Sequence, residues 1–202
     1  ALVVFYLGAA SLLALAVVAV VLLWALRDEP SDARRTDGPL PQEPGTVLEV
    51  EPVAESPLAG SRAWRILYTT TARDGEPVEA SAAVYAPEDS TLTDLPVLVW
   101  GHGTSGFARD CSPSLQQDPM AAGSMYVGDE VLRRGWVLVA PDFPGVGADG
   151  EQPYLIGEGA GRTMLDAARA AREVDGLSTS PRTAVWGFSQ GGHAALWAGG
   201  LQ

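Results

Sequence analysis

The chain has 202 residues and a formal net charge of −12, from 25 acidic and 13 basic residues, a length that suits one domain plus accessory segments. This acidic balance argues against nucleic acid as a partner, because binding to a phosphate backbone needs clustered Lys and Arg. The single cysteine, Cys111, allows no disulfide within the chain, and no group of Cys, His and carboxylates has metal-ligand spacing, so we expect no metal.

The first 26 residues carry no charge. As a helix rising about 1.5 Å per residue, they would exceed the ~30 Å hydrocarbon core of a bilayer. A cleavable signal peptide has an apolar stretch of only about 7 to 15 residues, and Trp24-Ala25-Leu26 offers no clean cleavage site. We therefore predict a transmembrane anchor over residues 1–26, with a signal segment as the alternative, and a catalytic part outside the cytoplasm.

Residues 27–46 are rich in Pro, charge and small side chains and predict a flexible linker. Residues 47–202 alternate between strand and helix patterns. Strands are predicted at 47–53, 63–71, 77–85, 95–100, 136–140 and 183–186, and helices at 126–134, 159–174 and 190–198. The runs LPVLVW and WVLVA are short, continuous and apolar, which suits strands buried on both faces. This alternation predicts an α/β fold, with a mainly parallel sheet flanked by helices.

The segment Gly187-Phe188-Ser189-Gln190-Gly191, between the last predicted strand and helix, matches the nucleophile-elbow pattern G-x-S-x-G. Ser189 would lie at the tip of a strained turn, and glycines at 187 and 191 would let strand and helix approach closely. Free N–H groups at the helix N-terminus would stabilise developing negative charge. The pattern predicts an α/β-hydrolase with Ser189 as nucleophile; the alternative is a tight structural turn with a surface serine.

The sequence Gly101–Gly106 (GHGTSG) directly follows the first buried run. In hydrolases of this fold, the loop after that strand donates one backbone N–H to the oxyanion, and the residue after the nucleophile donates the other. These positions are Thr104 and Gln190. The alternative for Gly101–Gly106 is an ordinary glycine turn.

Asp142 follows the second buried run, and we expect it to organise its loop or to shape the oxyanion side. It is not the expected triad acid, because the order in this fold is Ser, then Asp or Glu, then His. His102 is expected to make local hydrogen bonds, and His193, one helical turn after Ser189, to pack beneath the site. The triad acid and histidine are therefore expected beyond Gln202, in a chain truncated after the elbow helix.

Four segments in this order resemble bacterial members of the secretory lipase family: HGTSG, DCSPS, APDFPGVGADGEQPYLIGEGAGRTMLDAARAAR and WGFSQGGHAALWAG. The resemblance covers residues 45 to 202. It implies an α/β-hydrolase fold, export from the cytoplasm, and hydrolysis of carboxylic esters, often acylglycerols. A membrane anchor is not typical of that family.

For the site, the resemblance implies Ser189 as nucleophile and Gln190 as an oxyanion donor, and it leaves Thr104 and Asp142 open as the second donor. It also implies that Cys111 is bridged to a cysteine outside this chain. No cofactor is implied.

The sequence thus predicts a carboxylic ester hydrolase, a lipase or esterase that acts through an acyl-enzyme on Ser189. The 202 residues alone should be nearly inactive, since loss of a triad member costs several powers of ten in rate. One alternative is a serine peptidase or acyltransferase of the same fold, because the elbow does not specify the leaving group. Another is a catalytically dead, membrane-tethered binding protein.

Overall fold

The computed structural model describes residues 18, 38–89, 91, 93–116 and 127–201. The chain divides into two compact units, Ala1–Asp32 and Ala33–Gln202, and the fold described below is that of the second unit. The predicted membrane segment, apart from Val18, and the linker up to residue 37 lie outside the described residues. Within the described ranges, no helix combines the length and apolar character needed to cross a bilayer.

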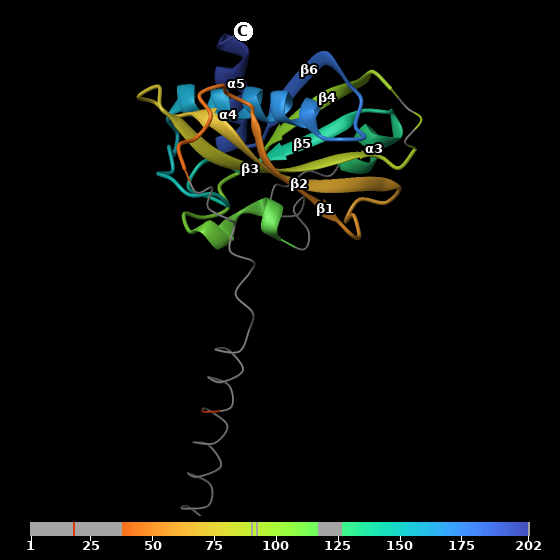
Figure 1. Ribbon diagram of the computed structural model, residues 1–202, viewed down its shortest axis with the longest axis horizontal. Helices are drawn as coiled ribbons and strands as arrows, with labels where there is room; N and C mark the ends of the chain where they lie inside the picture. Colours follow the sequence, from red (N-terminus) through yellow and green to blue (C-terminus); the bar gives the residue numbers. More distant parts are fainter. Residues whose placement is uncertain (1–17, 19–37, 90, 92, 117–126, 202) are drawn as a thin grey trace, which may run out of the picture. The chain divides into compact units, whose positions relative to one another are not determined.

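A six-stranded sheet in the order β1-β2-β3-β5-β4-β6 forms the centre of this unit (Figure 1). Its strands are β1 (Val47–Val53), β2 (Ser61–Thr71), β3 (Pro77–Pro87), β4 (Leu95–Gly101), β5 (Val137–Pro141) and β6 (Thr179–Gly187). The strands β5, β4 and β6 are parallel, whereas the β1–β2, β2–β3 and β3–β5 pairs are antiparallel. The sheet is therefore mixed and not mainly parallel as predicted, because the first three strands run back and forth before the parallel part begins.

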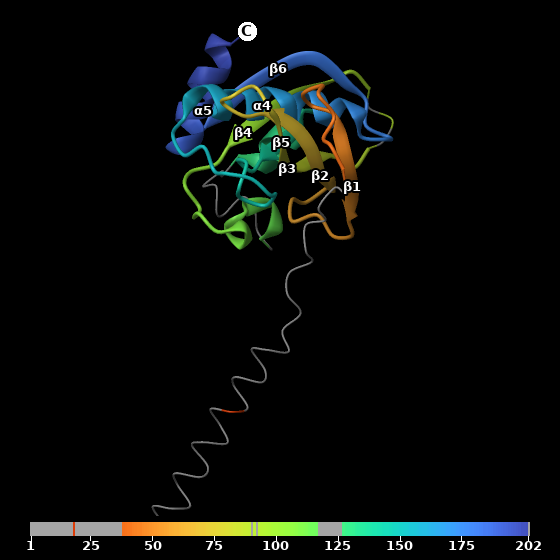
Figure 2. The same ribbon diagram turned by 60° about the vertical axis from the view of Figure 1, so that its left-hand side comes forward.

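Three α-helices pack on this sheet in the described part of the chain: α3 (Gly128–Arg133), α4 (Gly157–Ala170) and α5 (Gln190–Gly200). Three single 3₁₀ turns accompany them: η1 (Arg109–Cys111), η2 (Pro113–Leu115) and η3 (Ala171–Glu173). Figure 2 shows α4 and α5 side by side.

Strand β4 shows how the helices cover the sheet. Its residues Val97 and Val99 belong to the core beneath α4 and α5, whereas Leu98 and Trp100 belong to a second core that includes Leu132 of α3. Successive side chains of a strand point to opposite faces, so the helices cover both faces. The prediction that β4 and β5 are buried on both sides is confirmed.

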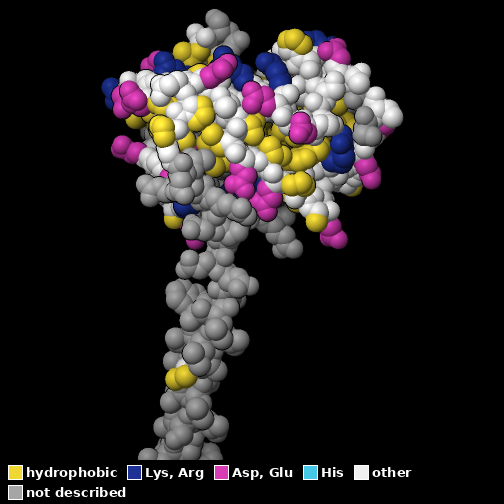
Figure 3. All heavy atoms as spheres, viewed as in Figure 1, with side chains coloured by type: hydrophobic (Ala, Val, Ile, Leu, Met, Phe, Trp, Pro, Cys, Tyr) yellow, Lys and Arg dark blue, Asp and Glu magenta, His cyan; other side chains and the backbone are white. Residues whose placement is uncertain are grey.

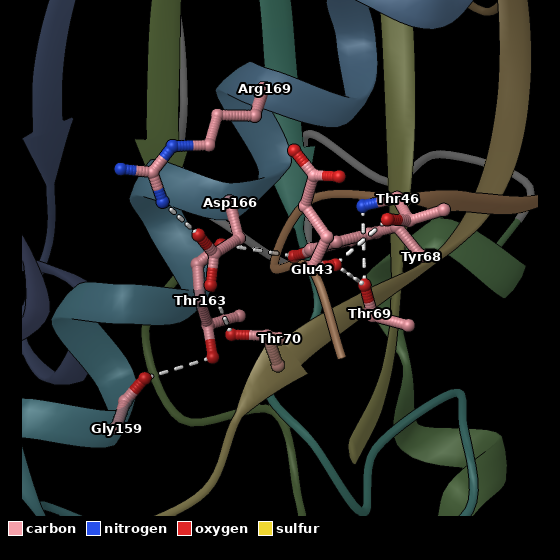
Figure 4. Close-up of polar contacts among 9 residues, drawn as sticks. All are labelled: Glu43, Thr46, Tyr68, Thr69, Thr70, Gly159, Thr163, Asp166 and Arg169. Carbon is pink, nitrogen blue, oxygen red and sulfur yellow. Dashed lines mark hydrogen bonds and ion pairs between the residues drawn. The ribbon is translucent and has the colours of Figure 1, made fainter. Parts of the chain in front are cut away.

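Helix α4 is fastened to β2 by polar contacts that Figure 4 draws. The fully buried carboxylate of Asp166 accepts a hydrogen bond from the Thr70 hydroxyl (2.8 Å) and forms an ion pair with Arg169. The buried Tyr68 hydroxyl donates to the backbone carbonyl of Thr163 (3.1 Å). Burial raises the pKa of Asp166, although the Thr70 hydrogen bond and Arg169 oppose that rise.

The residues just before β1 are also held by β2 (Figure 4). The Thr69 hydroxyl donates to the Glu43 carbonyl (2.7 Å), and the Gly45 N–H donates to the Thr69 carbonyl (2.7 Å). The Thr46 N–H in turn donates to the Thr69 hydroxyl (3.1 Å). Residues from Glu43 onward, within the segment 27–46 that the sequence predicted as linker, are therefore hydrogen-bonded to β2. Such backbone pairing does not depend on the polar composition of the segment.

Charged side chains of both signs are interspersed on the face shown in Figure 3. Some charged residues form ion pairs within a single helix or its cap, such as Arg134 with Glu130 (2.6 Å) and Arg162 with Glu158 (2.6 Å). Such pairs each contribute about 1 kcal/mol or less. The stability of the unit therefore comes mainly from its two apolar cores.

Candidate active site

Ser189 occupies the turn between the end of β6 at Gly187 and the start of α5 at Gln190. Its φ of 52° and ψ of −115° are a strained combination for a residue with a side chain. Backbone hydrogen bonds hold the turn on both sides: the Phe188 N–H donates to the Gly101 carbonyl (3.1 Å), and the Gly191 N–H donates to the Phe188 carbonyl (2.9 Å). The structure thus contains the strained strand–turn–helix geometry that the sequence predicted.

Three glycines make this turn sterically possible. A Cβ atom on Gly191 would overlap the carbonyl group of Gly101, and one on Gly187 would overlap the carbonyl group of Gly191. A Cβ atom on Gly101 would lie only 2.8 Å from the Cα of Gly191. The sequence predicted the close approach at Gly187 and Gly191 but missed that Gly101, at the end of β4, takes part in it.

Gln190 is buried and is the first residue of α5. Its N–H belongs to the first turn, where no carbonyl of the helix is available as an acceptor. Among the described residues, no other backbone carbonyl accepts from it either. This N–H is adjacent to Ser189 and is available to an anion at the site.

The loop that carries Thr104 contacts the elbow. A Cβ atom on Gly103 would lie 3.1 Å from the Phe188 ring, so the backbone at this position lies against the elbow. The Thr104 hydroxyl is 3.3 Å from the Tyr154 hydroxyl, and no backbone carbonyl in the described ranges accepts from the Thr104 N–H. Gln190 directly follows Ser189, and Thr104 follows the glycine that contacts the elbow. At both predicted positions, the backbone N–H has no backbone acceptor among the described residues.

Asp142 is fully buried, and its polar groups are already engaged. Its carboxylate accepts hydrogen bonds from the Ser81 hydroxyl (2.6 Å) and the Ser114 N–H (3.1 Å), and its own N–H donates to the Ser81 carbonyl (2.8 Å). These contacts join β3, the loop after β5 and η2. They fit the loop-organising role, whereas donation of this N–H to an oxyanion would require its bond to Ser81 to break.

Neither histidine ring reaches Ser189. The Nδ1 atom of the buried His102 lies 2.5 Å from the Gly103 carbonyl oxygen, and its ring packs on Phe143 with centroids 5.1 Å apart. His193 contacts Ser189 only through the backbone, where its N–H donates to the Ser189 carbonyl (3.0 Å). In the described part of the chain, no side chain forms a hydrogen bond with the Ser189 hydroxyl.

Burial lowers the pKa of His102, although the negative charge of Asp142 and the hydrogen bond to Gly103 oppose this. The ring is therefore neutral around pH 7. In the described ranges, no group of three or more Cys, His, Asp or Glu side chains could hold a metal ion. The thiol of Cys111 is free and packs against Gly106.

Sequence reasoning missed the segment that packs against the loop carrying Thr104. The Gln152 amide donates to the Gly106 carbonyl (3.4 Å), and the Tyr154 ring packs edge-on against Phe107 with centroids 5.2 Å apart. This segment leads directly into α4. No motif marks it in the sequence, because these contacts form only when two loops distant in the chain are brought together by the fold.

Comparisons with known proteins agree with this geometry. A family model described as "Secretory lipase" matches residues 120–202. The chain is similar to "Secreted triacylglycerol lipase LIP4" of Malassezia globosa, with 31% identity over 178 residues, which cover 82% of this chain and 38% of that protein. It is also similar to "Probable inactive lipase MT1628" of Mycobacterium tuberculosis, with 30% identity, covering 77% of this chain and 37% of that protein.

Among solved structures, a rice cell wall degrading esterase, LipA from Xanthomonas oryzae, superimposes with a TM-score of 0.61 and 27% identity, covering 77% of this chain and 45% of that one. The chain thus spans less than half the length of these relatives. The order of the strands, the strained serine between β6 and α5 and these similarities lead to one assignment. The described part of the chain has the α/β-hydrolase fold, and residues 120–202 of the sequence match the secretory lipase family.

Proposed function

We propose that the full-length protein hydrolyses carboxylic esters and that Ser189 is its nucleophile. The observation that carries this proposal is the backbone of Ser189, which is held in a strained conformation beside the N-terminus of α5. A surface serine with a structural role has no need of such strain, whereas a nucleophile must be presented to the substrate. The names of the relatives, a secreted triacylglycerol lipase and a cell wall degrading esterase, support an ester as substrate.

In the proposed reaction, the Ser189 hydroxyl attacks the ester carbonyl carbon and its proton passes to a histidine. The carbonyl oxygen becomes an oxyanion that accepts hydrogen bonds from the N–H groups of Gln190 and Thr104. The intermediate collapses, and the alcohol leaves with the proton from the histidine. Water then attacks the acyl-enzyme, giving its proton to the histidine, and the serine is restored as the acid leaves. This reaction requires no cofactor.

The general base and the triad acid in this proposal lie beyond Gln202. His102 is engaged with its own loop, and His193 offers Ser189 only its backbone N–H. The greater length of the relatives leaves room for both residues.

We also propose that the catalytic unit acts outside the cytoplasm. The uncharged segment 1–26 would anchor it in the membrane, or act as a signal segment, and the polar residues from 27 to about 42 would form the tether. The word "secreted" in the name of one relative supports export. The substrate would be an acylglycerol or another lipid ester.

The decisive test compares the full-length wild type with Ser189→Ala and with the matched control Ser178→Ala. Ser178 is exposed and lies just before β6, at the end opposite the elbow. We expect hydrolysis of p-nitrophenyl esters and labelling by a fluorophosphonate in the wild type and in Ser178→Ala, and neither in Ser189→Ala. Equal labelling of all three proteins would refute Ser189 as the nucleophile.

A second candidate function is favoured by one relative, whose name describes it as a probable inactive lipase. If the folded full-length protein neither hydrolyses esters nor reacts with the fluorophosphonate, the result would refute the hydrolase and favour a tethered binding protein. Labelling without ester hydrolysis would instead direct the search to amide substrates or acyl acceptors, as expected for a peptidase or an acyltransferase.

A further inference from the structure

His102 is a buried, titratable side chain for which the proposed reaction has no direct use. It lies in the loop between β4 and η1, only 4% of its surface is exposed, and its ring packs on Phe143. Its Nδ1 atom is 2.5 Å from the carbonyl oxygen of the next residue, Gly103. Its Nε2 atom is buried and has no hydrogen-bond partner among the described residues.

These contacts determine which ring nitrogen carries the proton. A carbonyl oxygen can only accept a hydrogen bond, so Nδ1 must be the donor. Because burial keeps the ring neutral around pH 7, Nε2 then carries no proton. The geometry therefore assigns the Nδ1–H tautomer to His102.

The carbonyl group of Gly103 and the N–H of Thr104 belong to the same peptide unit. That unit is planar and trans, so its C=O and N–H bonds point in opposite directions. A contact that fixes the direction of the Gly103 oxygen also fixes the direction of the Thr104 N–H. In the described part of the chain, no backbone hydrogen bond holds this unit, which leaves the His102 ring as its restraint.

We propose that His102 is a positioning residue: its Nδ1–H holds the Gly103 carbonyl and thereby directs the Thr104 N–H towards the oxyanion that forms on Ser189. This inference rests on the proposed function. His102 itself does not touch the substrate. Glycine at 103 would otherwise leave the peptide unit free to rotate, and a donor that rotates away stabilises the transition state less.

The chain offers a matched set of substitutions at this position. In His102→Asn, the amide nitrogen can take the place of Nδ1 and donate to Gly103, whereas in His102→Gln it falls near the place of Nε2. His102→Ala has no donor. Removal of one oxyanion donor costs about 10²–10³ in kcat, so we expect kcat to fall about 10²-fold in the Gln and Ala variants. The Asn variant should retain kcat within about 5-fold, and KM should change less than about 3-fold in all three.

The experiment measures kcat, KM and the affinity for a trifluoromethyl ketone, which forms a tetrahedral adduct with a serine, in the full-length protein. If His102 acts by positioning, this affinity falls together with kcat in the Gln and Ala variants. The midpoints of thermal unfolding of the three variants should not rank in the same order as their kcat values. Equal kcat in the wild type and in His102→Gln would overturn the proposal while leaving Ser189 as the nucleophile.

A second measurement does not depend on activity. ¹⁵N NMR of the histidine ring in the wild type should show a protonated Nδ1 and a bare Nε2 for His102, and a bare Nδ1 would overturn the proposal whatever the rates. A wild type without hydrolase activity would refute the proposed function, and with it the role of His102. The two failures are thus distinguishable.

Discussion

At the scale of single residues, the geometry of the site depends on the glycines around Ser189 as much as on the serine itself. The carbonyl of Gly101 and the backbone of Gly191 are so close that no other residue fits at either position. The strained φ of Ser189 persists because Phe188 and Gly191 are both held by backbone hydrogen bonds. Packing between β4, β6 and α5 therefore maintains the presentation of the serine.

The substitution Gly191→Ala should lower the free energy of unfolding by about 3 kcal/mol or more, because its Cβ would collide with backbone atoms that have little room to move. Gly199→Ala is the control in the same helix. A Cβ there meets nothing within 4 Å, so this change should stabilise the protein by about 0.5–1 kcal/mol. Urea unfolding of both variants measures the difference, and similar stabilities would contradict the close approach.

Asp166 provides a prediction about pH. Burial raises its pKa in the folded state, so the folded protein binds this proton more tightly than the unfolded chain does. The stability that protonation contributes is present at acid pH and is lost as the pH rises through the raised pKa. Relative to Asp166→Asn, which cannot titrate, the wild type should therefore lose stability as the pH rises above the ordinary pKa of an aspartate, about 4.

Unfolding curves at several pH values test this prediction. A wild type that gains stability relative to Asp166→Asn as the pH rises would contradict a raised pKa.

At the scale of elements, helices α4 and α5 approach closely at two glycines of α4. A Cβ atom on Gly157 would overlap the indole ring of Trp197, and one on Gly161 would lie 2.8 Å from the backbone nitrogen of Ala198. Both Trp197 and Ala198 are on the helix that begins next to Ser189. The position of α5, and with it the elbow, depends on this contact.

Gly157→Ala should therefore destabilise the protein by about 1–3 kcal/mol, unless the half-exposed Trp197 moves aside. In a double-mutant cycle with Trp197→Leu, we expect the two changes to couple, because the smaller side chain makes room for the new methyl group. Gly159→Ala in the same helix is the control, since its Cβ would meet only Pro153 at 3.8 Å. Strict additivity would show that the two helices do not meet at this point.

The elements also show what the sequence could predict. Continuous apolar runs identified β4 and β5, and the glycine pattern identified the turn before α5. By contrast, β6 begins at Thr179 and not at 183, because residues from Thr179 onward pair with β4 through contacts that β6's own sequence does not reveal. The local hydrogen bonding expected of His102 is confirmed by its contact with Gly103. The contact of Tyr154 with Thr104 could not be foreseen, because these residues lie in two loops that are distant in the chain.

At the scale of the whole molecule, the catalytic machinery proposed for Ser189 is divided between these 202 residues and the chain that would follow them. We expect the 202 residues, expressed alone, to hydrolyse esters at least about 10³-fold more slowly than the full-length protein, since loss of a triad member costs that much or more. Initial rates with equal amounts of the two folded proteins test this. Comparable rates would mean that His102 or His193 serves as the base, and substitution of each would then identify it.

The attachment of residues 43–46 to Thr69 has a consequence for how the unit could be released from the proposed membrane anchor. A protease that cuts before Glu43 would leave every hydrogen bond between this segment and β2 intact, and the freed unit would keep its fold. A cut after Thr46 would detach the partner of the Thr69 N–H, which lies 2.9 Å from the Thr46 carbonyl, and leave the end of β2 without these hydrogen bonds. Shedding into the medium without loss of stability is therefore expected only for cleavage upstream of Glu43.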